Sequence, residues 1–214
     1  CVFMCGYPVA LQLAKVVPLA APIPRAAWAA GRPVYRSDLI VREDAPFRTL
    51  EDTFGGCAGW TVEHSHSGFN AFRHHLLQYR TASRLALYGE MVPNLVTARA
   101  ILDSVRTGRI DVGPLDAYWH LLLAQHNPAL TAGIRVLDST DVATLPAFVT
   151  AASTPISTVN VLRSAFASAA RHSWFSEYAD TLLIEGFAAV DLPDYARTLA
   201  WDRAAKAAGY EYPA

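Results

Sequence analysis

The sequence predicts an α/β fold from three observations. Apolar segments of strand length alternate along the chain with segments whose apolar residues recur every three or four positions. The changes between the two patterns fall at glycine, proline, serine or aspartate. The 214 residues are 52% hydrophobic and 17% charged, which suits a soluble protein with a sizeable core and is too apolar for a disordered chain. Alternating strands and helices favour parallel sheets with right-handed crossovers.

The first part of the chain contains three predicted strands and one short predicted helix. The strands are residues 1–6 (CVFMCG), 35–44 (YRSDLIVRED) and 57–62 (CAGWTV), of which we expect the first and third to be buried, and the helix is residues 47–56 (FRTLEDTFGG), capped by Thr49. The prolines from Pro18 to Pro33 exclude a single helix. We expect that stretch to cross the surface as an extended segment with turns.

The rest of the chain alternates between the two patterns. Helical spacing predicts helices at residues 67–80 (SGFNAFRHHLLQYR), 93–108 (PNLVTARAILDSVRTG), 115–126 (LDAYWHLLLAQH), 157–172 (STVNVLRSAFASAARH) and 193–209 (PDYARTLAWDRAAKAAG). Strand patterns fall at residues 109–114 (RIDVGP), 134–140 (IRVLDST) and 145–152 (LPAFVTAA). In open α/β sheets, ligands bind beyond the carboxyl ends of strands. The turn HSHSG, between residues 57–62 and the helix at 67–80, lies in such a place.

Charge and cysteine content exclude several classes of function. Eighteen basic residues oppose nineteen acidic ones, and no segment gathers Lys or Arg on one face, so nucleic acid is not an expected partner. Cys1, Cys5 and Cys57 form neither a disulfide framework nor a zinc knuckle. The first residues lack a leader pattern, so we expect a signal peptide to be absent or removed. Lipidation of Cys1 is disfavoured because an apolar run follows it in place of a polar tether.

Residues 61–75, TVEHSHSGFNAFRHH, concentrate chemically capable side chains at one strand-to-helix turn. A serine nucleophile in a G-x-S-x-G elbow needs small residues two positions to either side. Ser65 has Glu63 and Ser67 there, and Ser67 has Ser65 and Phe69. The spacing therefore disfavours serine hydrolysis.

The four histidines of this stretch also fail as a metal site. His64 and His66 form an H-x-H pair without a cysteine or a well-spaced carboxylate, and His74 and His75 point to different sides of their helix. We expect surface or loop histidines and no bound metal.

Anion binding explains more of the turn. A helix N-terminus offers unpaired N–H groups and the positive end of its dipole, and glycine lets an anion approach the backbone. Ser65, Ser67 and the amides of Gly68 and Phe69 would supply the donors. The alternative is an ordinary serine N-cap without a ligand.

The order of motifs adds a resemblance that spans nearly the whole chain. It is carried by CGYP, YRSDLIVRED, TLEDTFGGCAGWTVEHSHSGFNAFRHHLL, GRIDVGPLDAYWHLL, LPAFVTAA and EGFAAVDLPDYARTL. Together they resemble the phosphate/phosphonate-type substrate-binding components of ABC importers. The resemblance implies an α/β type II periplasmic-binding-protein fold, in which two lobes are joined by two crossing strands and the ligand lies between them.

The crossings would fall near residues 35–39 and 137–144. One lobe would then comprise residues 1–39 with 137–214, and the other residues 40–136. Members of this family carry a further strand and helix before the segment that matches CGYP. We therefore expect the first lobe to be truncated at its N-terminus.

The resemblance also assigns ligand-binding residues. The backbone amides of Ser65, His66 and Ser67 would hold phosphonate oxygens. A family His-x-x-Ser element falls on Asn94 to Thr97, where Asn replaces His.

The resemblance places further ligand contacts at an acidic residue and two tyrosines. The family's acidic position falls on Asp116, and Asp116 or Glu63 would suit a ligand amine. Tyr7 and Tyr35 match positions lining the ligand. The alternatives are a helix N-cap for Asp116 and packing roles for both tyrosines.

The resulting functional hypothesis is a periplasmic solute-binding protein of an ABC importer. It would capture a small phosphate-like or phosphonate-like oxyanion and deliver it to permease subunits in the membrane, with no cofactor and no catalysis. The alternatives are an enzyme on the same fold that acts on a small carboxylate, marked by a catalytic His64 or His66, or a ligand sensor without transport.

Overall fold

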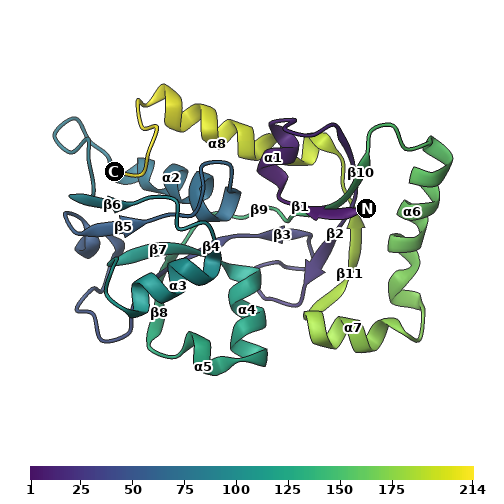
Figure 1. Ribbon diagram of the computed structural model, residues 1–214, viewed down its shortest axis with the longest axis horizontal. Helices are drawn as coiled ribbons and strands as arrows, with labels where there is room; N and C mark the ends of the chain where they lie inside the picture. The colour runs from purple at the N-terminus through teal and green to yellow at the C-terminus, as the bar shows by residue number, and fades with distance from the viewer. The chain divides into compact units, whose positions relative to one another are not determined.

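The computed structural model describes residues 1–214 and divides them into two compact units (Figure 1). The first comprises Cys1–Tyr35 with Val142–Leu199, and the second Arg36–Asp141 with Ala200–Ala214. The expected lobes differ from these units mainly at the C-terminal end. Ala200–Ala214 belongs to the second unit, where Tyr210 is part of the hydrophobic core and Asp202 forms an ion pair with Arg73.

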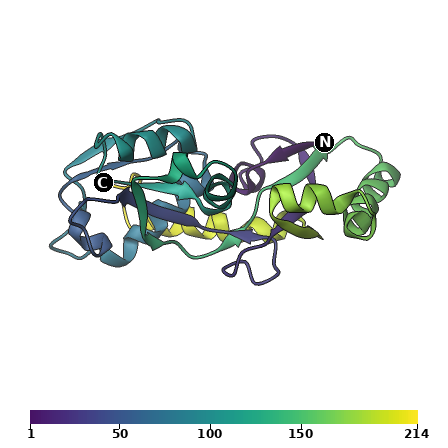
Figure 2. The same ribbon diagram turned by 90° about the horizontal axis from the view of Figure 1, so that it is seen from below.

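The first unit is built on a four-stranded antiparallel sheet. Its strands, in spatial order, are β1 (Val2–Met4), β10 (Ala147–Ala151), β2 (Val16–Pro24) and β11 (Ile184–Ala189). A short ladder joins β3 (Val34–Tyr35) to β9 (Ala143–Thr144). The helices are α1 (Gly6–Ala10), α6 (Ile156–Ser168), α7 (Phe175–Leu182) and the start of α8 (Ala196–Ala207), with 3-10 turns Ala169–Arg171 and Leu192–Tyr195. Helices α6 and α7, green in Figure 2, contact β11.

The proline-rich stretch departs from the expectation only in its first part. Residues 18–24 lie in the largely buried strand β2, whereas residues 25–33 form bends and turns that are mostly exposed or half-buried, as expected. Prolines fit in this strand because the two neighbours of β2 pair with different halves of it. Strand β10 pairs with residues 16–20 and β11 with residues 20–24, so each proline faces a partner strand on one side only. A proline lacks the backbone N–H, and on the side of β2 without a partner strand there is no ladder hydrogen bond to lose.

Strand β1 is an edge strand and not the buried strand expected for residues 1–6. Val2 is 63% exposed and Phe3 50%, although the Phe3 ring packs on Phe148 at 5.1 Å. The apolar composition of this run indicated a strand but not its place in the sheet.

The second unit holds a five-stranded mixed sheet. The strand order is β6 (Glu90–Val92), β5 (Cys57–Gly59), β7 (Val112–Asp116), β4 (Ser37–Arg42) and β8 (Ile134–Ser139). Strand β5 pairs in parallel with β6 and β7, whereas β4 runs antiparallel to β7 and β8. The expectation of parallel sheets is therefore correct only for the β6–β5–β7 part. The chain enters the second unit at β4, and this strand runs in the opposite direction to β5, β6 and β7.

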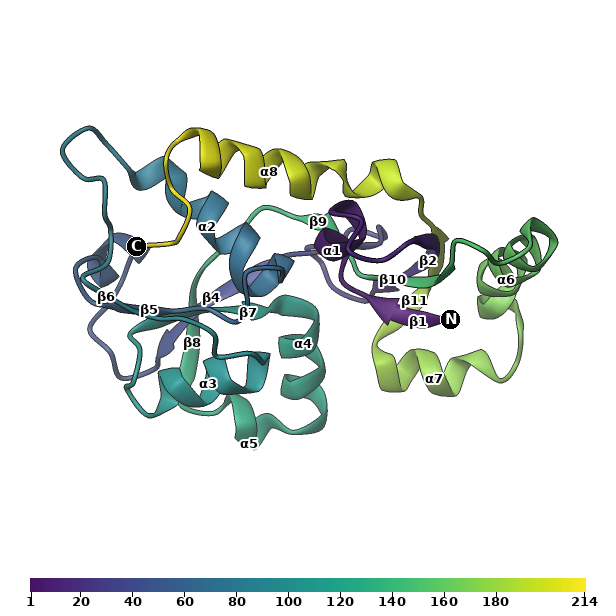
Figure 3. The same cartoon turned by 45° about the horizontal axis from the view of Figure 1, so that its top comes forward.

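Helices cover both faces of this sheet, as Figure 3 shows. Helix α2 (Ala71–Leu76) and the second-unit part of α8 lie on one face, and α3 (Ala98–Arg106), α4 (Ala117–His126) and α5 (Pro128–Thr131) on the other. Side chains of β4 alternate between the two cores. Leu39 and Val41 pack in the core that contains Phe72 of α2, whereas Ile40 packs in the core that contains Ile101 of α3.

Two helices begin or end differently from the sequence expectation. Residues 93–97 are not helical, because Asn94 and Val96 adopt positive φ values of 56° and 66°, and α3 begins only after its N-cap Thr97. Residues 47–56 contain only the 3-10 turn Leu50–Thr53. None of the helices is both long enough and apolar enough to cross a membrane.

Candidate functional site

The predicted binding turn lies at one edge of the five-stranded sheet. The parallel strands β5, β6 and β7 all end at this edge, and the antiparallel β4 begins there with Ser37, which pairs with Asp116 at the end of β7. The turn after β5, the segment after β6 and Asp116 are therefore neighbours, although they are far apart in sequence. The turn thus lies beyond the carboxyl ends of the parallel strands, where ligands bind in open α/β sheets.

The turn itself is a π-helical segment, His66–Asn70, that continues directly into α2. Ser65 is its N-cap, and its Oγ accepts a hydrogen bond from the Gly68 amide at 3.1 Å. The first backbone bond of the segment runs from Asn70 N to Ser65 O at 3.0 Å. The amides of Ser67 and Phe69 precede that bond and have no acceptor within the helix. The Gly68 amide, expected to face a ligand, is instead occupied by Ser65.

Ser67 links the turn to the two neighbouring strands. Ser37 Oγ donates to the Ser67 carbonyl at 2.8 Å, and Ser67 Oγ donates to Asp116 Oδ2 at 3.2 Å. Ser65 and Ser67 are both partly exposed. The structure thus brings Ser65, Ser67 and Asp116 together, as the sequence analysis expected, and adds Ser37, which it missed.

Asp116 also caps α4. Its Oδ1 accepts the amides of Tyr118 at 3.0 Å and Trp119 at 2.9 Å. Burial raises the pKa of the Asp116 carboxyl and the nearby Asp38 charge adds to the rise, while the amide and Ser67 bonds act in the opposite direction. The N-cap interpretation is thus realised for this residue, and its Oδ2 remains directed at the turn.

Gly68 is needed for the close approach of the turn to Thr61. A Cβ at position 68 would lie 2.0 Å from Thr61 Oγ1. That hydroxyl is buried and has no hydrogen-bond partner in the structure. The sequence analysis placed Thr61 near the end of the predicted strand 57–62 and assigned it no role.

His66 points away from solvent into the unit. It is 2% exposed, its Nδ1 contacts Asn70 Nδ2 at 3.3 Å, and its ring stacks on Trp201 at 5.2 Å. Burial, with a smaller contribution from His74, lowers the pKa of His66 to about 3. Its imidazole is therefore neutral at physiological pH. The ring is also buried away from the solvent side of the turn, and both properties disfavour a catalytic role for His66.

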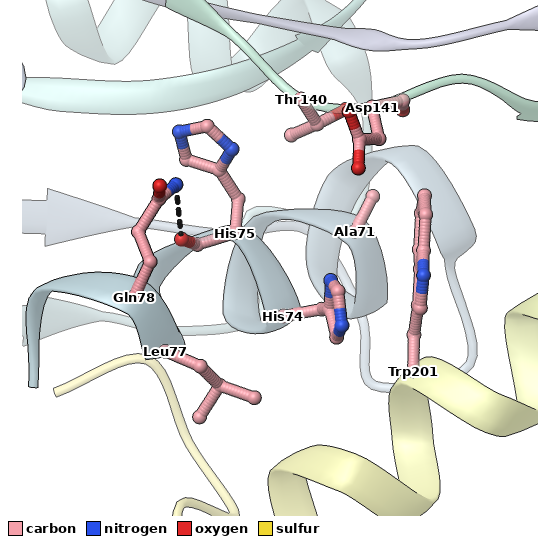
Figure 4. A pocket seen from close by; sticks show the side chains of 8 residues that line it. All are labelled: Ala71, His74, His75, Leu77, Gln78, Thr140, Asp141 and Trp201. Atoms are coloured by element: carbon pink, nitrogen blue, oxygen red, sulfur yellow. Dashed lines mark hydrogen bonds between the residues drawn. The ribbon is translucent and has the colours of Figure 1, made fainter.

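The other histidines of the stretch are separated. His64 is exposed, His75 Nε2 contacts Asp138 Oδ2 at 2.8 Å, and His74 stacks on Trp201 at 4.8 Å. Figure 4 shows His74, His75 and Trp201 around a cavity of about 540 Å³. The structure contains no cluster of three or more His, Cys, Asp or Glu side chains suited to a metal ion. That no metal binds here stays a prediction for elemental analysis.

The remaining predicted residues occupy other positions. Asn94 is exposed in the loop after β6, and Thr97 Oγ caps α3 by accepting the Ala100 amide at 3.1 Å. Glu63 is exposed. Phe69 is buried against Trp60 at 4.8 Å, so only its backbone could serve a ligand.

The two predicted tyrosines belong to the first unit. Tyr7 is 4% and Tyr35 2% exposed, and the Tyr35 hydroxyl lies 3.9 Å from Cys5 Sγ. Their packing role is thus evident, and a ligand contact by either one stays a prediction.

Comparison with known families identifies the family to which the chain belongs. The profile of a family described as "ABC transporter, phosphonate, periplasmic substrate-binding protein" matches residues 3–195. The chain belongs to this family. It is therefore a substrate-binding component of the ABC-transporter class, and the resemblance found in the sequence is confirmed. A search of curated proteins finds no match.

Solved structures confirm the fold class. A binding protein component of an ABC phosphonate transporter from Pseudomonas aeruginosa matches with a TM-score of 0.80 and 15% identity over 97% of this chain and 68% of that one. PhnD1 from Prochlorococcus marinus, in complex with methylphosphonate, gives 0.78 and 13% over 95% and 77%. XAC2383 from Xanthomonas citri, bound to ATP, gives 0.68 and 15% over 97% and 78%. At these identities the likeness establishes the periplasmic-binding-protein fold.

Proposed function

We propose that this chain binds a small phosphonate-like oxyanion at the turn formed by residues 65–69. One observation carries the proposal. Ser67 is hydrogen-bonded to Ser37 on one side and to Asp116 on the other, at a sheet edge where its own amide and that of Phe69 have no acceptor in the helix. An anion placed there would accept both amides and lie at the positive end of the helical segment.

The donors suit a ligand of low charge. Hydroxyls and amides can satisfy an oxyanion without a cationic side chain, and neutral donors avoid burying an unpaired positive charge when the site is empty. The Asp116 carboxylate lies one hydrogen bond away from the same serine. It would favour a ligand that also carries an amine or a protonated oxygen, because both donate to a carboxylate.

Family membership supports this class of ligand. PhnD1, one of the structural matches, binds methylphosphonate. Other proteins with this fold hold adipate or ATP, so the choice of a phosphonate depends on the turn and not on the fold.

The wider role follows from the family. In the periplasm, the protein would present the bound solute to the permease subunits of the membrane and would itself catalyse no reaction. Selection and release need only reversible binding, and the one buried histidine of the turn is kept neutral by its surroundings.

Calorimetric titration tests the proposal. The full chain should bind methylphosphonate and 2-aminoethylphosphonate more tightly than sulfate or adipate. Ser67→Ala should weaken phosphonate binding roughly tenfold or more, because Asp116 loses the hydroxyl that donates to its Oδ2 and is left as an unpaired carboxylate beside the anion. Ser164→Ala, at an exposed serine of α6, is the matched control and should bind as the wild type does. Absence of phosphonate binding, or equal affinity in Ser67→Ala, would refute the site.

A further inference from the structure

A buried polar network runs from the binding turn to helix α8. Its centre is Arg73 on α2, which is 2% exposed. The guanidinium donates through Nη2 to Asp202 Oδ1 of α8 at 2.5 Å and to Asn70 Oδ1 at 3.2 Å, and through Nη1 to the Glu211 carbonyl at 2.9 Å. The Phe69 ring lies 4.8 Å from it. One side chain therefore contacts the turn, α8 and the C-terminal segment.

Asn70 connects Arg73 to His66, the first residue of the π-helical segment. Arginine is a donor only, so the Asn70 oxygen faces Arg73 and its NH₂ group faces His66 Nδ1 at 3.3 Å. His66 Nδ1 must then accept, which leaves the proton of the neutral ring on Nε2. The orientation of Asn70 and the tautomer of His66 are thus both set by Arg73.

Helix α8 also contacts the turn through an aromatic stack. The Trp201 indole lies nearly parallel to the His66 ring, with 18° between the planes, and to the His74 ring, with 11°. Figure 4 shows His74 of α2 facing Trp201 of α8. Asp202, the next residue of α8, forms the ion pair with Arg73. Two adjacent residues of α8 therefore contact the aromatic stack and the polar network.

We propose that Asn70, Arg73 and Asp202 are positioning residues that hold the oxyanion-binding turn in shape and couple it to helix α8. This inference rests on the proposed function of the turn. A π-helical segment of five residues has poor intrinsic stability, so its geometry must come from contacts outside it. The network supplies these contacts from residues of a helix that begins more than a hundred positions later in the chain.

The consequence is that changes at α8 reach the binding turn without touching a ligand. Asp202 is buried, whereas Lys206, which pairs with its Oδ2 at 2.9 Å, is 58% exposed. Loss of Asp202 would leave the Arg73 charge buried and unpaired, and loss of Lys206 would remove a solvent-screened pair. Comparing substitutions of Asp202 and Lys206 therefore distinguishes the effect of the buried network from that of an exposed ion pair.

Hydrogen exchange of the full chain without ligand tests the positioning directly. Asn70→Ala should speed exchange of the hydrogen-bonded amides of the turn, at positions 68, 70 and 71, roughly tenfold while the protection of α8 residues 200–207 is kept, because the Arg73–Asp202 pair survives. Asp202→Asn should speed exchange in both segments, and Lys206→Ala in neither. Unchanged exchange of the turn in both Asn70→Ala and Asp202→Asn would overturn the inference. This readout does not depend on any ligand.

A spectroscopic signature distinguishes positioning from general stability. In the wild type, ¹⁵N NMR should report His66 as the Nε2–H tautomer. Asn70→Asp keeps the oxygen that accepts from Arg73 but offers a second acceptor to His66, so the ring should change to the Nδ1–H form. An unchanged tautomer in Asn70→Asp contradicts the proposed relay.

Affinity for methylphosphonate then separates this inference from the proposed function. Asn70→Ala should bind it roughly tenfold more weakly than the wild type, and Lys206→Ala within about twofold. Wild-type affinity in a folded Asn70→Ala would overturn the coupling and leave the site intact. Absence of binding by the wild type would refute the proposed ligand, and the exchange and tautomer results would still decide the network.

Discussion

Asp116 caps α4 with one carboxylate oxygen and accepts from Ser67 with the other, and a substitution can separate the two roles. Asp116→Asn keeps Oδ1 as the cap of α4, since asparagine caps as well as aspartate. Its new NH₂ group would donate to Ser67 Oγ and release the Ser67 proton toward an anion. We expect methylphosphonate to bind equally or more tightly and 2-aminoethylphosphonate roughly tenfold more weakly, because its amine loses a charged partner.

Calorimetry of both ligands measures this difference, with Asp103→Asn as control. Asp103 forms an exposed pair with Arg99 on α3 and lies outside the site. Equal losses for the two phosphonates in Asp116→Asn would reduce Asp116 to a helix cap.

His66 should make the stability of the protein depend on acid. Its pKa is lowered to about 3 in the folded state, whereas an unfolded histidine titrates near 6.5. The unfolded state binds more protons between these values, so the stabilising contribution is complete above pH 6.5 and is lost as the pH falls toward 3. From pH 7 to pH 4 this loss is about 3 kcal/mol.

Urea denaturation at the two pH values tests the assignment. The His66→Asn variant should lose about 3 kcal/mol less than the wild type over this interval, since its amide does not titrate. His64→Asn, at an exposed position, should behave as the wild type does. An identical pH dependence in His66→Asn would show that His66 is not held neutral.

The turn between β5 and α2 depends on the absence of a side chain at position 68. Gly68→Ala should cost about 1–3 kcal/mol of unfolding free energy, because the new Cβ would overlap Thr61. Gly186→Ala is the matched control, since its Cβ would meet only Ala170 at 3.6 Å.

Chemical denaturation of the two variants gives the comparison. Adding Thr61→Ala to Gly68→Ala should recover part of the loss, because the overlapping hydroxyl and methyl groups are removed. A Gly68→Ala protein as stable as Gly186→Ala would mean that the turn tolerates a side chain.

Most helices and strands follow from periodicity, and the exceptions have physical causes. Strand β2 was missed because its prolines exclude a helix but are compatible with a strand that pairs with each neighbour along only half its length. Helix α3 starts late because Asn94 and Val96 take left-handed backbone conformations, which apolar spacing does not indicate. Helix α7 and strand β11 were not assigned at all. Leu183, which lies between them, takes a left-handed backbone conformation that ends α7, and apolar spacing does not indicate such an end.

Local pattern could indicate candidate site residues only where they are neighbours in sequence, and Asp116 was indicated by the family resemblance instead. Ser65, Ser67 and Gly68 fall on one turn, and its strand-to-helix pattern was sufficient to find them. Ser37 and Asp202 could not be found, because their contacts with Ser67 and Arg73 span 30 and 129 positions. Such contacts depend on how strands and helices are ordered in space, which no local pattern reports.

Binding at one turn should stabilise the folded chain as a whole. A ligand that binds only the folded state at a hundredfold excess over its Kd adds about 2.7 kcal/mol to the free energy of unfolding. For a chain of this size we expect the melting temperature to rise by roughly 5–10 °C with methylphosphonate. Thermal denaturation with adipate at the same concentration is the control, and an equal rise with both would remove the selectivity for phosphonates.

Amide chemical shifts test the oxyanion site most directly. In ¹H–¹⁵N spectra of the full chain titrated with methylphosphonate, the amides of Ser67 and Phe69 should move strongly downfield, because each gains a charge-assisted hydrogen bond. The amide of Gly68, already bonded to Ser65, should move less. Saturable shifts confined to other parts of the chain, or none at Ser67 and Phe69 under saturating ligand, would contradict the assignment of this turn as the binding site.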